Sequence, residues 1–312
     1  MNFEYREIFP LKQDKESYKQ LHHELFKSAA IDDEWLEWYH QDICSADDCL
    51  AKTRTYGLFD GKRLIGIWSV EPKSFKNSDG NNLKVGRCFA VGISEDYRRM
   101  GLFVSLSKYA IEQERNIGEF EYIFGFPQTG RSVIGGHYKA GWKEVAMFDI
   151  FSCDLALVDY PYSKHGVKDI IDFKNIELST SLNSFCETYL YKNTRYLKHP
   201  RLNYMLFQYN TSYIILKYYS SFCHIVEMNG SVSEIFHLLQ VCKSVAKSHG
   251  LEELNVWSSD IFRFRKSLVE AGFQKGAKHG LPITFIAIPI HAVDDFKLSY
   301  EMNIGMGVEE GY

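Results

Sequence analysis

The residues from Gly92 to Phe103 have the composition of a phosphate-binding turn. They lie where an apolar run ends and a helical pattern begins, so their backbone N–H groups are expected at the positive end of a helix dipole. Gly101 permits a positive φ or a close approach of ligand to backbone. Arg98 and Arg99 can add charge-assisted hydrogen bonds to a diphosphate. Taken alone, the pattern fits a phosphate site and an ordinary strand-to-helix turn with a solvated Arg pair equally well.

Two further patterns follow in the sequence. Phe126-Pro127-Gln128 ends the next strand-like run, and Tyr138-Lys139-Ala140-Gly141-Trp142 closes the helical segment after it with a Gly-aromatic pair. Each pattern is weak by itself. Their order and spacing after the Arg-rich turn make them informative.

Together these motifs resemble the GNAT superfamily of acyl-CoA-dependent N-acyltransferases. The Arg-rich turn is similar to the pyrophosphate loop of that superfamily, written Q/R-x-x-G-x-G/A, with Arg98 in the first position and Gly101 in the central one. Phe103 stands where a final Gly or Ala is usual, as in branches written R-G-x-G-L-F. The resemblance extends roughly over residues 3–154.

The resemblance implies direct attack of a substrate amine on the thioester of an acyl-CoA, without a covalent enzyme intermediate. The backbone at Val91, Gly92 and Ile93 would pair with the pantetheine and offer an N–H to the oxyanion. The implied diphosphate-binding residues are Arg98, Arg99, Met100, Gly101, Leu102 and Phe103. Acetyl-CoA is the expected donor, and no metal is expected. The expected acceptor is a primary amine of a small molecule, for example an amino sugar.

The sequence identifies the catalytic acid and base less clearly than the residues that would bind the donor. In many GNAT relatives a Tyr four residues before the Gly of the Gly-aromatic pair protonates the leaving thiolate; here that position holds His137, and Tyr138 is its neighbour. Both stay candidates for the acid. Glu71, near the end of a strand, is the candidate base, and a solvated surface Glu is the alternative reading. Trp35 and Arg195 are the candidate contacts to the acceptor.

The elements that would position these groups follow the GNAT order. Apolar periodicity and turn signals predict strand, two helices, three strands, helix, strand, helix, strand. The predicted segments are strands at 3–8, 54–59, 63–70, 83–93, 122–126 and 143–153, and helices at 15–28, 33–41, 101–116 and 132–139. The helix at 33–41 is expected to be capped by Asp32 or Asp33.

The second half repeats part of this pattern. The predicted segments are helices at 182–194, 235–246 and 260–271, and strands at 204–209, 213–219, 223–228, 253–257 and 283–288. Residues 229–233, in the place of the Arg-rich turn, contain no Arg, so this copy is not expected to bind CoA. The predicted fold class is α/β, with a mixed, mostly antiparallel sheet, flanking helices and two GNAT-like domains in tandem. The predicted division is 1–154, a linker at 155–175, and 176–312.

Composition narrows the class of protein. Apolar residues make up 45% of the 312 and charged residues 24%, which is typical of a globular chain. A net charge of −4 argues against nucleic acid as a partner. The seven Cys form no CxxC pair, which favours reduced thiols over disulfides. The sequence contains no apolar run of about 20 residues, so no membrane helix is predicted. Since no secretory signal pattern occurs at residues 1–21, the expected location is the cytoplasm.

Two other functions remain open. The same fold can carry a longer acyl or an aminoacyl donor, or it can serve as a non-catalytic ligand-binding scaffold. The Arg98 turn favours an enzyme in the first half. Tandem chains with an R-Y-x-x-H-P element, here residues 195–200, resemble uncharacterised acyltransferases associated with polysaccharide biosynthesis.

Overall fold

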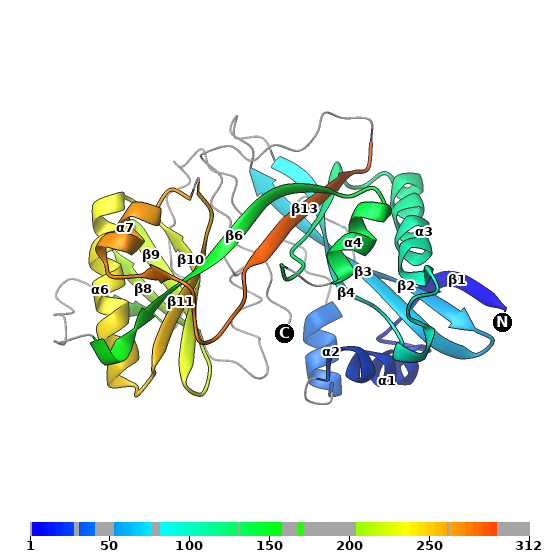
Figure 1. Cartoon of the computed structure of the whole chain (residues 1–312), viewed down its shortest axis with the longest axis horizontal. Coiled ribbons are helices and arrows are strands. Elements are labelled where there is room, and N and C mark those ends of the chain that lie inside the picture. Colours follow the sequence, from blue (N-terminus) through cyan, green and yellow to red (C-terminus); the bar gives the residue numbers. More distant parts are fainter. Residues whose placement is uncertain are drawn as a thin grey trace.

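The computed structural model describes residues 2–27, 31–40, 53–76, 82–129, 132–157, 168–170, 204–260 and 262–291. Within them the strands form one 13-stranded sheet in the order β1-β2-β3-β4-β5-β13-β6-β11-β10-β9-β8-β7, with β12 paired to β6. Figure 1 shows two lobes, one with α1 to α4 and the other with α6 and α7, joined by β6 and β13. The predicted fold class, mixed and mostly antiparallel with flanking helices, is confirmed.

The first half has the predicted order of elements. They are β1 (Phe3–Ile8), α1 (Lys15–Phe26), α2 (Asp33–His40), β2 (Arg54–Asp60), β3 (Arg63–Lys76), β4 (Asn82–Ile93), the 3₁₀ turn η1 (Glu95–Tyr97), α3 (Leu102–Ile117), β5 (Tyr122–Gly125), α4 (Ser132–Lys139) and β6 (Lys143–Asp154). Asp32 is the cap of α2, because its Oδ1 accepts the amide N–H of Trp35 at 2.7 Å.

The second half also follows the prediction where it is described. Its elements are the 3₁₀ turn η2 (Leu155–Leu157), β7 (Lys168–Ile170), β8 (Tyr204–Tyr209), β9 (Ser212–Tyr218), β10 (Phe222–Asn229), α6 (Val232–Ser248), β11 (Glu253–Ser258), α7 (Arg265–Glu270), β12 (Gln274–Lys275) and β13 (Ile283–Pro289). β7 lies in the predicted linker. α7 is shorter than predicted because the chain before it makes separate turns, from Phe262 to Ser259 and from Arg265 to Phe262. The helix predicted at 182–194 lies outside the described residues.

Helices cover both faces of the sheet in the first half. Successive side chains of a strand point to opposite faces, and here both sets are apolar. Trp68, Val70 and Cys88 belong to the core under α3, whereas Ile67 and Phe89 belong to the core under α1 and α2. Neighbouring residues of β3 and β4, the predicted site residues among them, therefore face opposite sides of the sheet.

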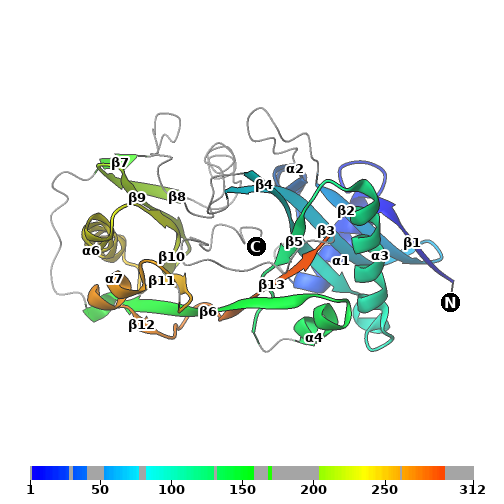
Figure 2. The same ribbon diagram turned by 90° about the horizontal axis from the view of Figure 1, so that it is seen from above.

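A strand from the end of the chain completes the first half. β13 lies between β5 and β6 and pairs antiparallel with both, Ile286 opposite Gly125 of β5 and Phe285 opposite Ala146 of β6. β6 continues past this pairing and joins β11 through residues 149–154. Figure 2 shows β6 extending from the half that carries α4 to the half that carries α6. The predicted division at residue 154 stays a prediction, but four strand pairings of the described residues cross it: β13 with β5 and β6, and β11 and β12 with β6.

Aromatic rings fill the joint between the halves. Phe126 stacks on Phe285 at 5.0 Å and lies 5.8 Å from Trp257 of β11, and Phe124 and Phe148 pack beside them. All five rings are buried. Since burying one large apolar side chain stabilises a fold by roughly 1.5–3 kcal/mol, this cluster ties the two halves together.

Strand exchange predicts that the first half is not stable alone. We expect residues 1–175 expressed without the remainder to be insoluble or to lack a cooperative thermal transition, because β5 and β6 would keep open edges facing each other. Co-expression with residues 176–312 should restore soluble protein. A cooperative transition of the 1–175 fragment alone would instead support the division at residue 154.

Candidate functional site

The two central strands of the first half pair over a short stretch only. β4 and β5 are parallel, and their register runs from Val85 opposite Tyr122 to Arg87 opposite Phe124. β4 then continues to Ile93, while β5 ends at Gly125. Within the described residues, the β4–β5 register therefore does not reach Ala90 to Ile93. The main-chain groups of Ala90 to Gly92 on that side are available to a ligand.

A β-bulge gives β4 its change of direction. Ile67 lies opposite Gly92 and Ser69 opposite Phe89, so two residues of β4, Ala90 and Val91, face one residue of β3. Ala90 has a φ of 45°, which is rare for a residue with a side chain. Such a bulge bends its strand and increases the twist. The sequence carries no signal of it, because nothing in an Ala predicts a left-handed backbone.

The turn after β4 leaves a row of backbone donors unused. Arg99 has a φ of 65° and Gly101 a φ of 76°, and Gly101 is the N-cap of α3 without a side-chain cap. The amides of residues 99–103 make no backbone hydrogen bond within the described part of the chain. Consecutive N–H groups beside a helix N-terminus form an anion-binding arrangement.

The side chains of the turn lie at the surface. The guanidinium of Arg98 is half exposed; its Nε donates to the carbonyl of Ile93 at 3.4 Å, and its Nη1 is 3.6 Å from Glu95. Arg99 and Met100 are exposed, and Leu102 is buried in the core under α3. The predicted cofactor-binding residues from Val91 to Phe103 are thus adjacent in space, and their role stays a prediction.

Phe103 contacts α4. Its ring is 5.1 Å from the ring of His137, and a Cβ added to Gly136 would meet it at 2.5 Å. The Gly at 136 therefore makes room for the ring that stands where the GNAT motif has a small residue. His137 also packs edge-on against Trp142, the aromatic residue of the Gly-aromatic pair, at 4.9 Å. Three of the predicted motif positions form one contact chain between α3, α4 and the start of β6.

The two candidate acids have different surroundings. His137 is 4% exposed, its Nδ1 has no partner in the described structure, and burial lowers its pKa to about 4. Tyr138 is 40% exposed, and its hydroxyl donates to Glu144 at 2.7 Å. Partial burial, followed by this bond, raises the pKa of Tyr138 to about 12. At neutral pH both groups carry a proton to donate, and His137 is uncharged.

Glu71 is buried, so its reading as a solvated surface residue is wrong. Its carboxylate lies 2.6 Å from Arg87 Nε and 3.0 Å from Lys73 Nζ, and all three side chains are about 1% exposed. Arg87 is the last residue of β4 that pairs with β5. Glu71 therefore lies where the two strands part, on the face covered by α1 and α2. Its role as base stays a prediction.

Of the two predicted acceptor contacts, one is described. Trp35 is 5% exposed and packs in the core under α1 and α2, with its ring 5.4 Å from His22. Its contact with an acceptor stays a prediction. Arg195 lies outside the described residues.

A buried ion pair holds α3 against the sheet. Glu114 is fully buried; it accepts hydrogen bonds from Arg54 at 2.6 and 2.8 Å and from the hydroxyl of Tyr56 at 2.7 Å. Arg54 also binds Glu119 at 2.6 Å. Sequence patterns do not reveal these contacts, since they join residues about sixty positions apart.

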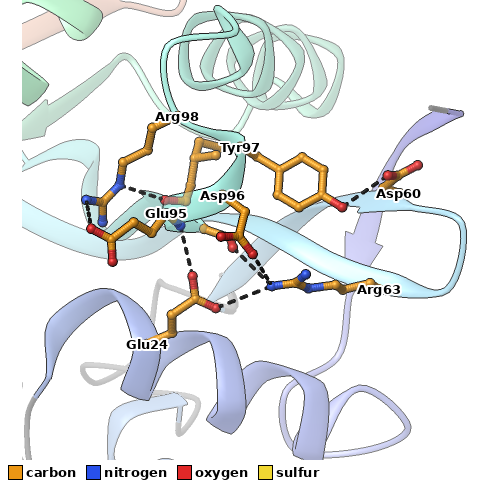
Figure 3. A network of polar contacts seen from close by, with 9 residues as sticks. Glu24, Asp60, Arg63, Glu95, Asp96, Tyr97 and Arg98 are labelled. Atoms are coloured by element: carbon orange, nitrogen blue, oxygen red, sulfur yellow. Dashed lines mark hydrogen bonds and ion pairs between the residues drawn. The ribbon is translucent and has the colours of Figure 1, made fainter.

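The turn before α3 is also held from outside. Each residue of η1 contacts a different partner: the amide of Glu95 donates to Glu24 of α1 at 2.9 Å, Asp96 lies 3.3 Å from Arg63, and the hydroxyl of Tyr97 donates to Asp60 at 3.1 Å. Figure 3 shows these side chains converging on η1 from α1 and from the β2–β3 hairpin. No local sequence pattern identifies Glu24 or Arg63, because their partners Glu95 and Asp96 lie far from them in the chain.

The second half has the same strand arrangement but a closed turn. β10 and β11 pair in parallel only from Phe222 to His224, and a bulge in β10 follows at residue 226. At the start of α6, however, the amide of Ser231 donates to Ser212 Oγ at 3.0 Å, and Ser231 Oγ accepts the amide of Glu234 at 3.3 Å. Two amides at this helix start, those of Ser231 and Glu234, are therefore bonded to side chains of the same chain.

A carboxylate also stands at that helix start. Ser212 and Asn210 both donate to Glu234, and these bonds lower its pKa. Gly230 has a φ of 137°, and a Cβ there would lie 1.8 Å from Ser212 Oγ. A negative charge and a filled turn disfavour a diphosphate at this position.

Neither a protein-family model nor a curated protein sequence matches this chain. Solved structures do. A GCN5-related N-acetyltransferase from Anabaena variabilis is similar with a TM-score of 0.67 at 12% identity, over 93% of this chain and 73% of the other. A tandem GNAT protein from the clavulanic acid biosynthesis pathway is similar with a TM-score of 0.60 at 10% identity, over 94% and 100%.

The chain has a GNAT fold, with two GNAT-like halves in tandem. An N-myristoyltransferase from Saccharomyces cerevisiae with bound myristoyl-CoA is also similar, with a TM-score of 0.61 at 10% identity, over 91% of this chain and 82% of the other. At such identities the similarity establishes the GNAT fold and leaves the chemistry to the site.

The described residues lack two features that would indicate other classes of protein. None of their helices is long and apolar enough to cross a membrane. They also contain no group of three or more His, Cys, Asp or Glu side chains arranged to hold a metal ion.

The ion pair under α3 predicts a large stability difference between two neighbouring carboxylates. Glu114→Ala should lower the free energy of unfolding by about 3–5 kcal/mol, because the buried hydroxyl of Tyr56 would lose its acceptor and Arg54 would keep only its bond to Glu119. Glu112→Ala, on the exposed face of the same helix, should change it by less than about 0.5 kcal/mol. Urea denaturation followed by circular dichroism measures both, and equal losses would contradict the assignment.

Proposed function

We propose that this chain is an acyl-CoA-dependent N-acyltransferase whose first half binds the donor. The observation that carries the proposal is the row of unused amides at residues 99–103, beside the stretch of β4 that β5 leaves unpaired. A diphosphate needs several N–H donors in one place, and a pantetheine amide chain needs an open strand edge. The GNAT fold supports this reading.

The donor would lie along β4 and the start of α3. Arg98 and Arg99 are exposed beside the free amides and would add charge-assisted bonds to the diphosphate. Val91, Gly92 and Ile93 come directly before the turn and would align the pantetheine. The bulge at Ala90 bends β4 next to its unpaired end, and a backbone N–H there would stabilise the oxyanion of the tetrahedral intermediate.

Between the two candidate acids we favour His137. Its ring touches Phe103 at the end of the donor turn, whereas the Tyr138 hydroxyl is engaged with Glu144 on β6. Because its pKa is about 4, the neutral imidazole would stabilise the departing thiolate by donating a hydrogen bond. The imidazolium form of His137 is a minor species at neutral pH for the same reason.

The acceptor would approach from the face of the sheet that α1 and α2 cover. Glu71 lies on that face at the point where the strands part, and it is the proposed base for the ammonium proton. Trp35 and Arg195 remain the proposed acceptor contacts. The proposed acceptor is a primary amine of a small molecule, with an amino sugar as the first to test.

The second half is proposed to provide acceptor-binding surface rather than a second donor site. Its turn is filled by Ser212 and Glu234, and β13 and the aromatic joint place it against the first half. An acetyl donor, a cytoplasmic location and a part in polysaccharide biosynthesis belong to the same proposal. A longer acyl donor is the alternative that the N-myristoyltransferase similarity keeps in view.

Acetyl-CoA binding tests the donor site. By calorimetry, the wild type should bind with a micromolar Kd. Arg98→Ala should weaken binding about tenfold, as expected for the loss of about 1.5 kcal/mol in charge-assisted bonds. Gly101→Glu should abolish it, because a side chain is strained at this φ and its charge repels the diphosphate.

Arg115→Ala, an exposed Arg at the other end of α3, is the matched control and should leave the Kd unchanged. If the folded wild type binds neither acetyl-CoA nor myristoyl-CoA, the enzyme proposal is overturned in favour of a non-catalytic scaffold. Binding of myristoyl-CoA alone would retain the transferase and replace the donor.

Transfer kinetics distinguish the two acids. With any amine acceptor that supports turnover, His137→Ala should lower kcat about 10- to 100-fold, and Tyr138→Phe should change it by less than threefold. Since His137 is neutral above pH 5, the wild-type rate should show no inflection from this group between pH 5 and 9. The reverse order of the two variants would assign the role to Tyr138.

A further inference from the structure

The donor turn is held by residues that do not belong to it. η1 precedes the free amides directly, and its three residues are tied to α1, to β3 and to the end of β2 (Figure 3). The free amides themselves have no tether. The position of η1 therefore sets the direction in which the row of N–H groups at 99–103 points.

Glu24 provides the tether from α1. Its Oε1 accepts the backbone N–H of Glu95 at 2.9 Å, and its Oε2 lies 3.9 Å from Arg63. A carboxylate that accepts a backbone N–H forms a charge-assisted bond, which is about twice as strong as a neutral one. This bond fixes the residue at which the chain leaves β4 for the turn.

Arg63 provides the tether from the β2–β3 hairpin. Its guanidinium lies 3.3 Å from Asp96 and 5.5 Å from the ring of Tyr97. The carboxylates of Glu24, Asp60, Glu95 and Asp96 lie around η1 (Figure 3). Their negative charge opposes an incoming diphosphate, and Arg63 offsets the part contributed by Glu24 and Asp96.

These contacts contribute little to the stability of the fold. The side chains of Arg63 and Asp96 are 53% and 73% exposed, and that of Glu24 is 34% exposed. Exposed ion pairs contribute about 0–1 kcal/mol. Their consequence is local: they hold a short turn in the one arrangement that leaves its following amides free.

We propose that Glu24 and Arg63 are positioning residues for the acyl-CoA donor, acting through η1 without touching the donor themselves. The inference rests on the proposed function. If the turn is already ordered, binding of the donor does not carry the entropic cost of ordering it. Removing a contact that holds the turn should therefore raise the Kd of the donor. Glu24 lies on α1, which covers the acceptor face, so the same contact links the two sides of the sheet.

The matched pair at position 24 isolates the hydrogen bond. Glu24→Ala removes the acceptor for the Glu95 amide and should raise the Kd for acetyl-CoA about tenfold. Glu24→Gln keeps an oxygen acceptor there and should raise it less than threefold. Both variants should unfold within about 2 °C of the wild type in a thermal scan.

A second pair tests Arg63. Arg63→Ala should raise the Kd about three- to fivefold, as expected for the loss of an exposed ion pair, and Arg63→Lys, which keeps the positive charge, should restore most of the affinity. Calorimetry at 50 and 200 mM salt should show a smaller loss for Arg63→Ala at the higher salt, since part of its effect is electrostatic.

Unchanged affinity in both Ala variants, with a wild type that binds acetyl-CoA, would overturn the positioning role and leave the donor site intact. A wild type that does not bind would overturn the proposed function instead. Equal losses of affinity and of thermal stability in Glu24→Ala and Glu24→Gln would show a purely structural role and would also overturn the inference.

Discussion

The bulge in β4 is the constraint on which the proposed site depends. A strand that stayed in register with β5 would use its N–H and C=O groups in the sheet and leave none for a ligand. Instead Ala90 takes a left-handed φ, two residues oppose one, and pairing with β5 ends at Arg87. The turn into α3, with its free amides, follows directly from the end of this displaced strand.

That departure is possible because other contacts hold the strands around it. β13 fills the sheet between β5 and β6, so β5 keeps a partner where β4 has left it. Glu114 of α3 accepts hydrogen bonds from Arg54 and Tyr56 of β2 and so holds the helix against that strand. The first half is thus a GNAT-like unit whose open edge is supported by a strand from the far end of the chain.

The two halves show how one architecture can be opened or closed by a few side chains. Both have a parallel pair that ends early and a bulge after it. In the first half the helix start has a glycine cap and no side-chain acceptor; in the second, Ser231, Ser212 and Glu234 occupy it. The difference lies in hydrogen bonding at the turn, since the strand arrangement is the same.

Local patterns in the sequence predicted nearly every described element and the Arg98 to Phe103 turn, because periodicity, Gly positions and strand-to-helix order are local properties. Tertiary structure decided the rest. It brought β13 between β5 and β6, buried Glu71 beside Arg87, set Phe103 against Gly136, and tied η1 to Glu24 and Arg63. These contacts join residues far apart in the chain, and their energies depend on distance and burial, which no local pattern encodes.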